Sequence, residues 1–262
     1  MNQEFQHIKI DIKNQYLNII FDRSEKKNAL NPKMINELQE VLEYYEKNNS
    51  IKLILISSNS DVFSAGADLE YLQKIKDFSQ EENLKDSEIL MHLFKTMLLY
   101  PKIIISKVCG AAIAGGCGIV TASDIVFATE DSKFGYPEVK IGFVPALVST
   151  FLINKIKETD LRMLLLTGVL IGAQKAKEIG LINHVCNNEN IQEEVEVFIE
   201  KIISKTSQNS IAETKKMIYL WLDLERKLEQ ATIINARNRK SEDFKKGLTC
   251  FLNKQPINWS KK

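Results

Sequence analysis

Long apolar runs, export signals and an excess of one charge are all missing from this sequence of 262 residues. No stretch approaches the roughly 20 apolar residues that a membrane-spanning helix needs, so we expect no membrane partner. Lys and Arg total 35 against 34 Asp and Glu, a formal net charge of +1. Because nucleic-acid binding usually requires a clearly basic face, nucleic acid is not an expected partner either.

Cysteine is also scarce, and its spacing matches neither a metal site nor a disulfide framework. The four residues are Cys109, Cys117, Cys186 and Cys250. The N-terminus lacks the apolar segment of a signal peptide. We therefore expect free thiols in a reducing compartment, a cytoplasmic location, and no metal or other cofactor.

The patterns that are present predict an α/β fold. Strands are expected at 6–12, 16–21, 51–57 and 102–108, and a helix after Asn31-Pro32. A mobile loop is expected around 77–88, before a helix at about 85–99. Beyond about residue 146 helical periodicity dominates. This change predicts two parts, a β/α core at 1–195 and a helical region at 196–262.

Two segments of small residues each follow an apolar strand. In SAGADL at 64–69, a tight turn would aim the Ala67 N–H into a cleft. In AAIAGGCG at 111–118, a helix beginning near Gly115 would supply free N–H donors for a developing negative charge. The alternatives are an ordinary turn with Asp68 as a helix cap, and close packing of a helix on a sheet.

A third segment, FGYPEVKIGFVP at 134–145, carries a candidate acid/base group. Pro137 disfavours a helical conformation at Tyr136, so Glu138 is expected on a constrained loop. A carboxylate held there among apolar side chains would have a raised pKa and could transfer protons. The alternative is a solvated loop glutamate.

Taken together, these segments resemble the crotonase (enoyl-CoA hydratase/isomerase) superfamily. The resemblance begins at KKNALN near 26–31 and runs through FSAGADL, GAAIAGGCG, ASDIVFA and FGYPEVKIGFVPA. It continues into LLLTGVLIGAQKAKEIGLINHV at 164–185 and so covers most of the chain in the expected order. It implies a spiral of ββα units, a helical C-terminal region and assembly into a homotrimer or hexamer.

The resemblance also implies an acyl-CoA substrate whose thioester oxygen is held by the N–H groups of Ala67 and Gly115. Coenzyme A would then arrive as part of the substrate. Glu138 is the implied catalytic carboxylate. The residues implied in substrate and coenzyme A binding are Lys27, Asn28, Ala29, Ala65, Gly66, Asp68, Leu69, Gly116, Gly118, Tyr136 and Pro137.

The sequence departs from the hydratase pattern at one position. Hydratases of this family carry two glutamates, and Gly118 stands where the first would be. A further position, eight residues after Glu138, is often Asp in dienoyl-CoA isomerases and dehalogenases, and here it is Ala146. This pattern disfavours those two reactions.

One glutamate is enough to move a double bond, because the same base can take a proton from one carbon and return it to another. We therefore expect Δ3-Δ2-enoyl-CoA isomerisation. The alternatives are enoyl-CoA hydration or the reverse dehydration, then acyl-CoA decarboxylation, and then a non-catalytic acyl-CoA binding protein.

Overall fold

A computed structural model describes residues 4–260 and contains two β-sheets of unequal size. The larger sheet has the order β1-β2-β3-β5-β7-β10. Its strands are β1 (Ile8–Lys13), β2 (Tyr16–Phe21), β3 (Leu53–Ser58), β5 (Ile103–Val108), β7 (Ile125–Thr129) and β10 (His184–Cys186). Strands β1 and β2 pair antiparallel, and every later pairing in this sheet is parallel.

The smaller sheet has the order β4-β6-β8-β9. Its strands are β4 (Val62–Ser64), β6 (Ala111–Ile113), β8 (Lys133–Gly135) and β9 (Ile171–Gly172). Three times in succession, the chain adds one strand to the large sheet and the next strand to the small one: β3 then β4, β5 then β6, β7 then β8. This repeated step confirms the expected α/β spiral of ββα units.

The central strand β3 shows why its sequence is apolar at consecutive positions. Ile54 and Ile56 pack into the main core beneath the helices, whereas Leu53 and Leu55 pack into a second core on the opposite face. A strand buried on both faces needs apolar side chains at every position. Val195 belongs to the second core, so helix α8 (Ile191–Lys205) covers that face.

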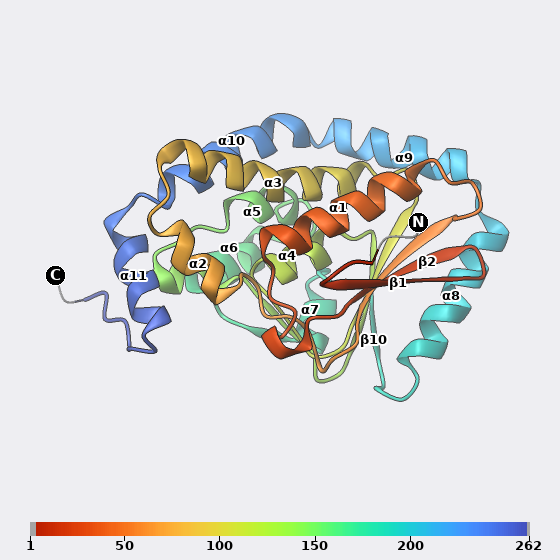
Figure 1. Cartoon of the computed structure of the whole chain (residues 1–262). Helices are drawn as coiled ribbons and strands as arrows, with labels where there is room; N and C mark the ends of the chain where they lie inside the picture. Colours follow the sequence, from red (N-terminus) through yellow and green to blue (C-terminus); the bar gives the residue numbers. More distant parts are fainter. Residues whose placement is uncertain (1–3, 261–262) are drawn as a thin grey trace.

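The helices surround these sheets (Figure 1). They are α1 (Pro32–Glu46), α2 (Leu69–Ile75), α3 (Gln80–Leu99), α4 (Gly115–Ala122), α5 (Ala146–Leu152), α6 (Glu158–Thr167), α7 (Ala173–Glu178), α8, α9 (Gln208–Trp221), α10 (Leu224–Asn238) and α11 (Glu242–Leu252). Helix α10 packs along α3 and against α5, and α11 packs against α2. Within residues 4–260, no helix is long and apolar enough to cross a membrane.

Two expectations from the sequence need correction. The mobile loop expected around 77–88 is largely helical, because Ser79 and Glu82 form a capping box that starts α3 at Gln80. The neighbouring lysines Lys215 and Lys216 would be expected on a solvated face, as lysine-rich patches usually are, but Lys215 is buried and its Nζ lies 2.6 Å from the Asp124 carboxylate. A buried ammonium group needs such a partner.

The division expected at residue 195 falls inside α8. Because α8 packs on the large sheet, this helix lies with the preceding core. The later helices α10 and α11 also return to the core and cover the region beside α2 and α3. The helical region thus packs closely on the β/α core. The division of the chain into parts 1–195 and 196–262 stays a proposal.

Candidate active site

The first small-residue segment forms a turn that leaves one backbone donor free. Gly66 has φ +91°, a conformation that glycine adopts without steric cost. Leu30 donates its N–H to the Gly66 carbonyl at 2.7 Å and accepts the Asp68 N–H at 2.9 Å. These two bonds flank Ala67, whose own N–H has no acceptor among residues 4–260. Ala67 is exposed and lines the main cavity.

The second segment frees a donor by an unusual backbone conformation. Ala114, directly before α4, has φ 49° and ψ −122°, the conformation that glycine usually supplies in a type II′ turn. Its N–H is bound to the Gly135 carbonyl at 2.8 Å, and its carbonyl accepts the Gly118 N–H at 2.9 Å. The Gly115 N–H, at the start of α4, has no acceptor in the described chain, and Gly115 also lines the cavity.

The two segments lie against each other because glycines allow it. A Cβ on Gly66 would stand 3.0 Å from the Ile113 carbonyl oxygen, and one on Gly116 would stand 2.6 Å from Ser64 Cβ. Glycine at both positions therefore lets the two backbones approach at the cavity wall. The result is two free N–H donors on one cavity, the arrangement that stabilises a negative oxygen.

Glu138 lies on the 3₁₀ helix η2 (Pro137–Ile141) and faces the same cavity. The Phe143 N–H binds the Glu138 carbonyl oxygen at 3.0 Å and fixes the loop. The carboxylate oxygen Oε2 is buried without a hydrogen-bond partner in residues 4–260. Burial raises the pKa of Glu138 to about 7, close to the value that suits a proton-transfer group at neutral pH.

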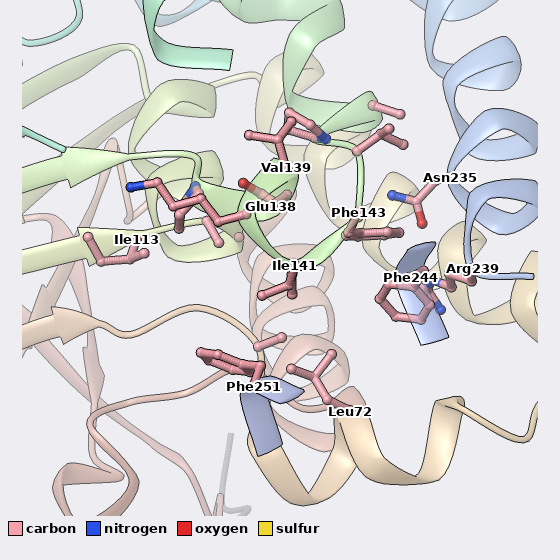
Figure 2. Close-up of a pocket in the computed structure, with 18 of the residues that line it drawn as sticks. Leu72, Ile113, Glu138, Val139, Ile141, Phe143, Asn235, Arg239, Phe244 and Phe251 are labelled. Carbon is pink, nitrogen blue, oxygen red and sulfur yellow. The ribbon is translucent and has the colours of Figure 1, made fainter. Parts of the chain in front are cut away.

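The cavity has a volume of about 1000 Å³ and is mostly apolar. Figure 2 shows Glu138 and Ile113 on one side, with Phe251 and Leu72 across from them. Tyr71 and Leu72, which lie shortly after the first small-residue segment and are for that reason expected to contact the acyl chain, both line it. A cavity of this size is typical of a small-molecule site.

Gly118 lies behind this wall, in a space that other side chains fill. A Cβ on Gly118 would stand 2.7 Å from Phe94 Cζ and 2.9 Å from Val148 Cγ2. Phe94 is fully buried and packs edge-on against Phe151 at a centroid distance of 5.3 Å. Position 118, where the resemblance led us to look for a second glutamate, is therefore closed to any side chain unless its neighbours move.

Several residues expected to bind coenzyme A instead support the first segment. The Asn28 side chain is buried, accepts the Arg23 N–H at 2.9 Å and donates to the Val62 carbonyl at 2.9 Å. Asp68 forms a buried ion pair with Arg23 at 2.6 Å and accepts the Tyr71 N–H, so it caps α2. These two side chains are not open to a ligand.

The Asp68 pKa is the net result of opposing effects. Burial acts to raise it, but hydrogen bonds from the Tyr71 N–H and from Arg23 outweigh burial and lower the pKa. Asp68 therefore stays ionised as the partner of Arg23.

The remaining expected residues divide by their access to the cavity. Ala65 and Pro137 line it, whereas Tyr136 is fully buried behind it and bonds Thr121 at 2.5 Å. Lys27 and Leu69 are exposed outside it, and Ala29 is buried. Coenzyme A binding through the backbone of 27–29 stays a prediction.

Sequence reasoning did not predict the side chains that the C-terminal part of the chain adds to the cavity. They come from α10, α11 and the segments that follow these helices, and include Asn235, Arg239, Phe244, Phe251 and Trp259. None of these residues belongs to a recognisable motif, and helical spacing alone does not say which face of a helix contacts a ligand. The 75–95 segment differs, because its place after the first small-residue segment leads us to expect it near the acyl chain, and its Asp86, Leu90 and Phe94 do line the cavity.

Comparisons with known proteins agree with this geometry. A family model for "Enoyl-CoA hydratase/isomerase" matches residues 11–262. A putative enoyl-CoA hydratase of Thermus thermophilus is 34% identical over 94% of this chain and 98% of its own length. The mitochondrial enoyl-CoA hydratase of Pongo abelii is 30% identical over 94% of this chain and 84% of its own length. A trans-2-decenoyl-[acyl-carrier-protein] isomerase of Streptococcus mutans is 24% identical over 96% and 97%.

Solved structures of similar proteins have the same fold as this chain. An enoyl-CoA hydratase from Bacillus halodurans superimposes with a TM-score of 0.86 at 28% identity, covering 94% of this chain and 100% of that one. A methylmalonyl-CoA decarboxylase, bound to 2-nitronate-propionyl-CoA, superimposes with a TM-score of 0.85 at 25% identity, covering 98% and 99%. The similar proteins therefore share the fold and differ in the reaction that their names describe.

Proposed function

The chain belongs to the enoyl-CoA hydratase/isomerase (crotonase) family, and we propose that it moves the double bond of a 3-enoyl-CoA thioester to position 2. The observation that carries this proposal is the closed space at Gly118. Phe94 and Val148 occupy the volume that a second carboxylate would need. Glu138 is left as the carboxylate beside the two free N–H donors.

The proposed reaction uses one base twice. Ionised Glu138 takes a proton from C2 of the substrate, and the electron pair moves through the thioester to its oxygen. The Ala67 and Gly115 N–H groups hold the resulting dienolate oxygen, as preorganised donors do in comparable sites. The protonated Glu138 then donates the same proton to C4, the double bond forms between C2 and C3, and the carboxylate is restored.

A second carboxylate, Asp86, also lines the cavity but differs from Glu138 in its contacts. It is hydrogen-bonded to Tyr71 and paired with Arg239. Both oxygens of this carboxylate are therefore already engaged by neighbouring side chains. Glu138, whose Oε2 lacks a partner in the described chain, is the better proton acceptor.

Hydration of a 2-enoyl-CoA is the second candidate, and the names of the similar proteins favour it. Hydration needs one group to activate water and another to protonate C2. Here Asp86 would have to supply the missing carboxylate despite its ion pair with Arg239.

The assembly into a homotrimer or hexamer and the cytoplasmic location also stay predictions.

The test is to incubate the purified protein with 3-enoyl-CoA and 2-enoyl-CoA of several chain lengths and to follow products by absorbance and mass. We expect the 3-enoyl substrate to become the conjugated 2-enoyl product without a change in mass. Glu138→Gln should lower kcat by about 10²- to 10⁴-fold, because it removes the acid/base group. Glu130→Gln, on an exposed turn, is the matched control.

Other outcomes would contradict the proposal. Undiminished turnover by Glu138→Gln would remove Glu138 from the reaction. Addition of water to the 2-enoyl substrate, without isomerisation of the 3-enoyl substrate, would favour the hydratase. An acyl-CoA binding protein would neither change a substrate nor exchange its C2 hydrogens with deuterated solvent.

A further inference from the structure

One wall of the cavity carries a group of polar side chains that the proposed reaction does not use. We call Tyr71, Asp86, Asn235 and Arg239 the polar cluster; they come from α2, α3 and α10 and all line the cavity, Arg239 directly following α10. In Figure 2, Asn235 and Arg239 lie beyond Phe143 as seen from Glu138. The cluster is thus placed to meet a part of the acyl group away from the thioester.

Hydrogen bonds already engage the carboxylate and amide oxygens of the cluster. Both Asp86 oxygens are engaged, one by the Tyr71 hydroxyl and the other by Arg239 Nη1. The Asn235 side-chain oxygen accepts the Ser87 hydroxyl at 2.9 Å. An additional donor on a ligand would therefore find few free acceptors here.

Donors, in contrast, are left over. Arg239 is only 7% exposed, and its Nε is buried without a hydrogen-bond partner in residues 4–260. Asn235 is 5% exposed, and the described chain offers no acceptor to its Nδ2. A buried donor that lacks a partner, as Arg239 Nε does, is rare and needs an explanation. An acceptor atom on the ligand would satisfy both groups.

The charge of the cluster indicates whether the ligand group that it binds is charged. Asp86 and Arg239 form a salt bridge with side chains that are 11% and 8% exposed, so their charges cancel. A carboxylate on the ligand would add an uncompensated negative charge beside Asp86, which is unfavourable in a buried site. A hydroxyl or carbonyl oxygen accepts hydrogen bonds without adding charge.

We propose that the cavity takes an acyl-CoA whose acyl chain bears an uncharged oxygen away from the thioester, and that Arg239 Nε and Asn235 Nδ2 donate to this oxygen. The inference deepens the proposed function and rests on it for the acyl-CoA part of the ligand. A plain alkyl chain in the same place would leave both donors unpaired. The polar cluster is thus a specificity site, separate from the proton transfer at Glu138.

The test measures the binding of saturated acyl-CoA thioesters, which cannot be isomerised, so a failure of the proposed reaction does not affect it. Isothermal titration would compare alkyl, keto and hydroxy chains, and ω-carboxylates, over a series of chain lengths. We expect the keto or hydroxy compound to bind about tenfold more tightly than its alkyl counterpart at a favoured length, as one added hydrogen bond to a charged donor allows.

Variants should locate this preference. Arg239→Lys keeps a cation beside Asp86 but removes the Nε donor, and Asn235→Leu removes the amide; each should abolish most of the preference. Arg237→Lys, the same substitution at an exposed position near the end of α10, is the matched control. Thermal melts would verify that the variants fold.

Three outcomes would overturn the inference. One is equal binding of alkyl and oxygenated chains at every length. Another is a preference that persists in both Arg239→Lys and Asn235→Leu. The third is tighter binding of ω-carboxylates than of hydroxy or keto chains, which would exclude an uncharged oxygen as the ligand group.

Discussion

Replacing Gly118 with alanine tests the packing on which the choice of reaction depends. The new Cβ would stand 2.7 Å from Phe94 and 2.9 Å from Val148. Exchanging glycine for alanine inside a helix normally stabilises by about 1 kcal/mol, whereas overfilling a packed core costs about 1–3 kcal/mol. Because Phe94 is held against Phe151, we expect the steric cost to lie in the upper part of that range, about 2–3 kcal/mol, which leaves a net loss of about 1–2 kcal/mol.

For a chain of this length, that loss should lower Tm by roughly 2–8 °C in a thermal melt. The cause can be isolated by repeating Gly118→Ala in a Phe94→Leu background, where the shorter side chain should leave room. We expect the cost of Gly118→Ala to fall markedly there, as coupled neighbours do in a double-mutant cycle. An unchanged Tm for Gly118→Ala, or the same cost in both backgrounds, would refute the steric reasoning.

Two further predictions concern the base and the turn beside it. Burial raises the pKa of Glu138 to about 7, and the base must be ionised to act. We therefore expect kcat/KM for isomerisation to rise about tenfold per pH unit below about pH 7 and to level off above it. A flat profile across this range would contradict the role of Glu138. Ala114→Gly should raise the free energy of unfolding by about 1 kcal/mol in denaturant titrations, because φ 49° with ψ −122° is strained for alanine, and a loss of stability would show that this strain is absent.

Local sequence signals predicted the parts of the molecule that depend on local chemistry. Apolar strands such as 53–58 are recognisable because burial on both faces demands consecutive apolar residues. The segments around Ala67 and Gly115 are recognisable because close approach of two backbones demands glycine and alanine. The structure brings both segments and Glu138 to one cavity.

Contacts between residues far apart in the chain could not be predicted from local sequence patterns. Asn28 resembles a binding residue by its place in a motif, but its amide is consumed by Arg23, Val62 and neighbouring serines. Lys215 belongs to a Lys-Lys pair that is typical of a solvated face. It is buried nevertheless, because its ammonium group pairs with Asp124, 91 positions away. No local pattern encodes a partner at such a separation.

The C-terminal helices show why the active site and the helical region have to be considered together. A Cβ on Gly247 of α11 would stand 2.3 Å from the Ile141 carbonyl oxygen, and one on Gly142 would stand 2.4 Å from the Asp243 carbonyl oxygen. Helix α11 therefore rests directly on the end of η2, the element that carries Glu138. The same C-terminal region supplies Arg239 to the polar cluster. Changes in how this region packs should thus alter both the position of the base and the choice of acyl chain.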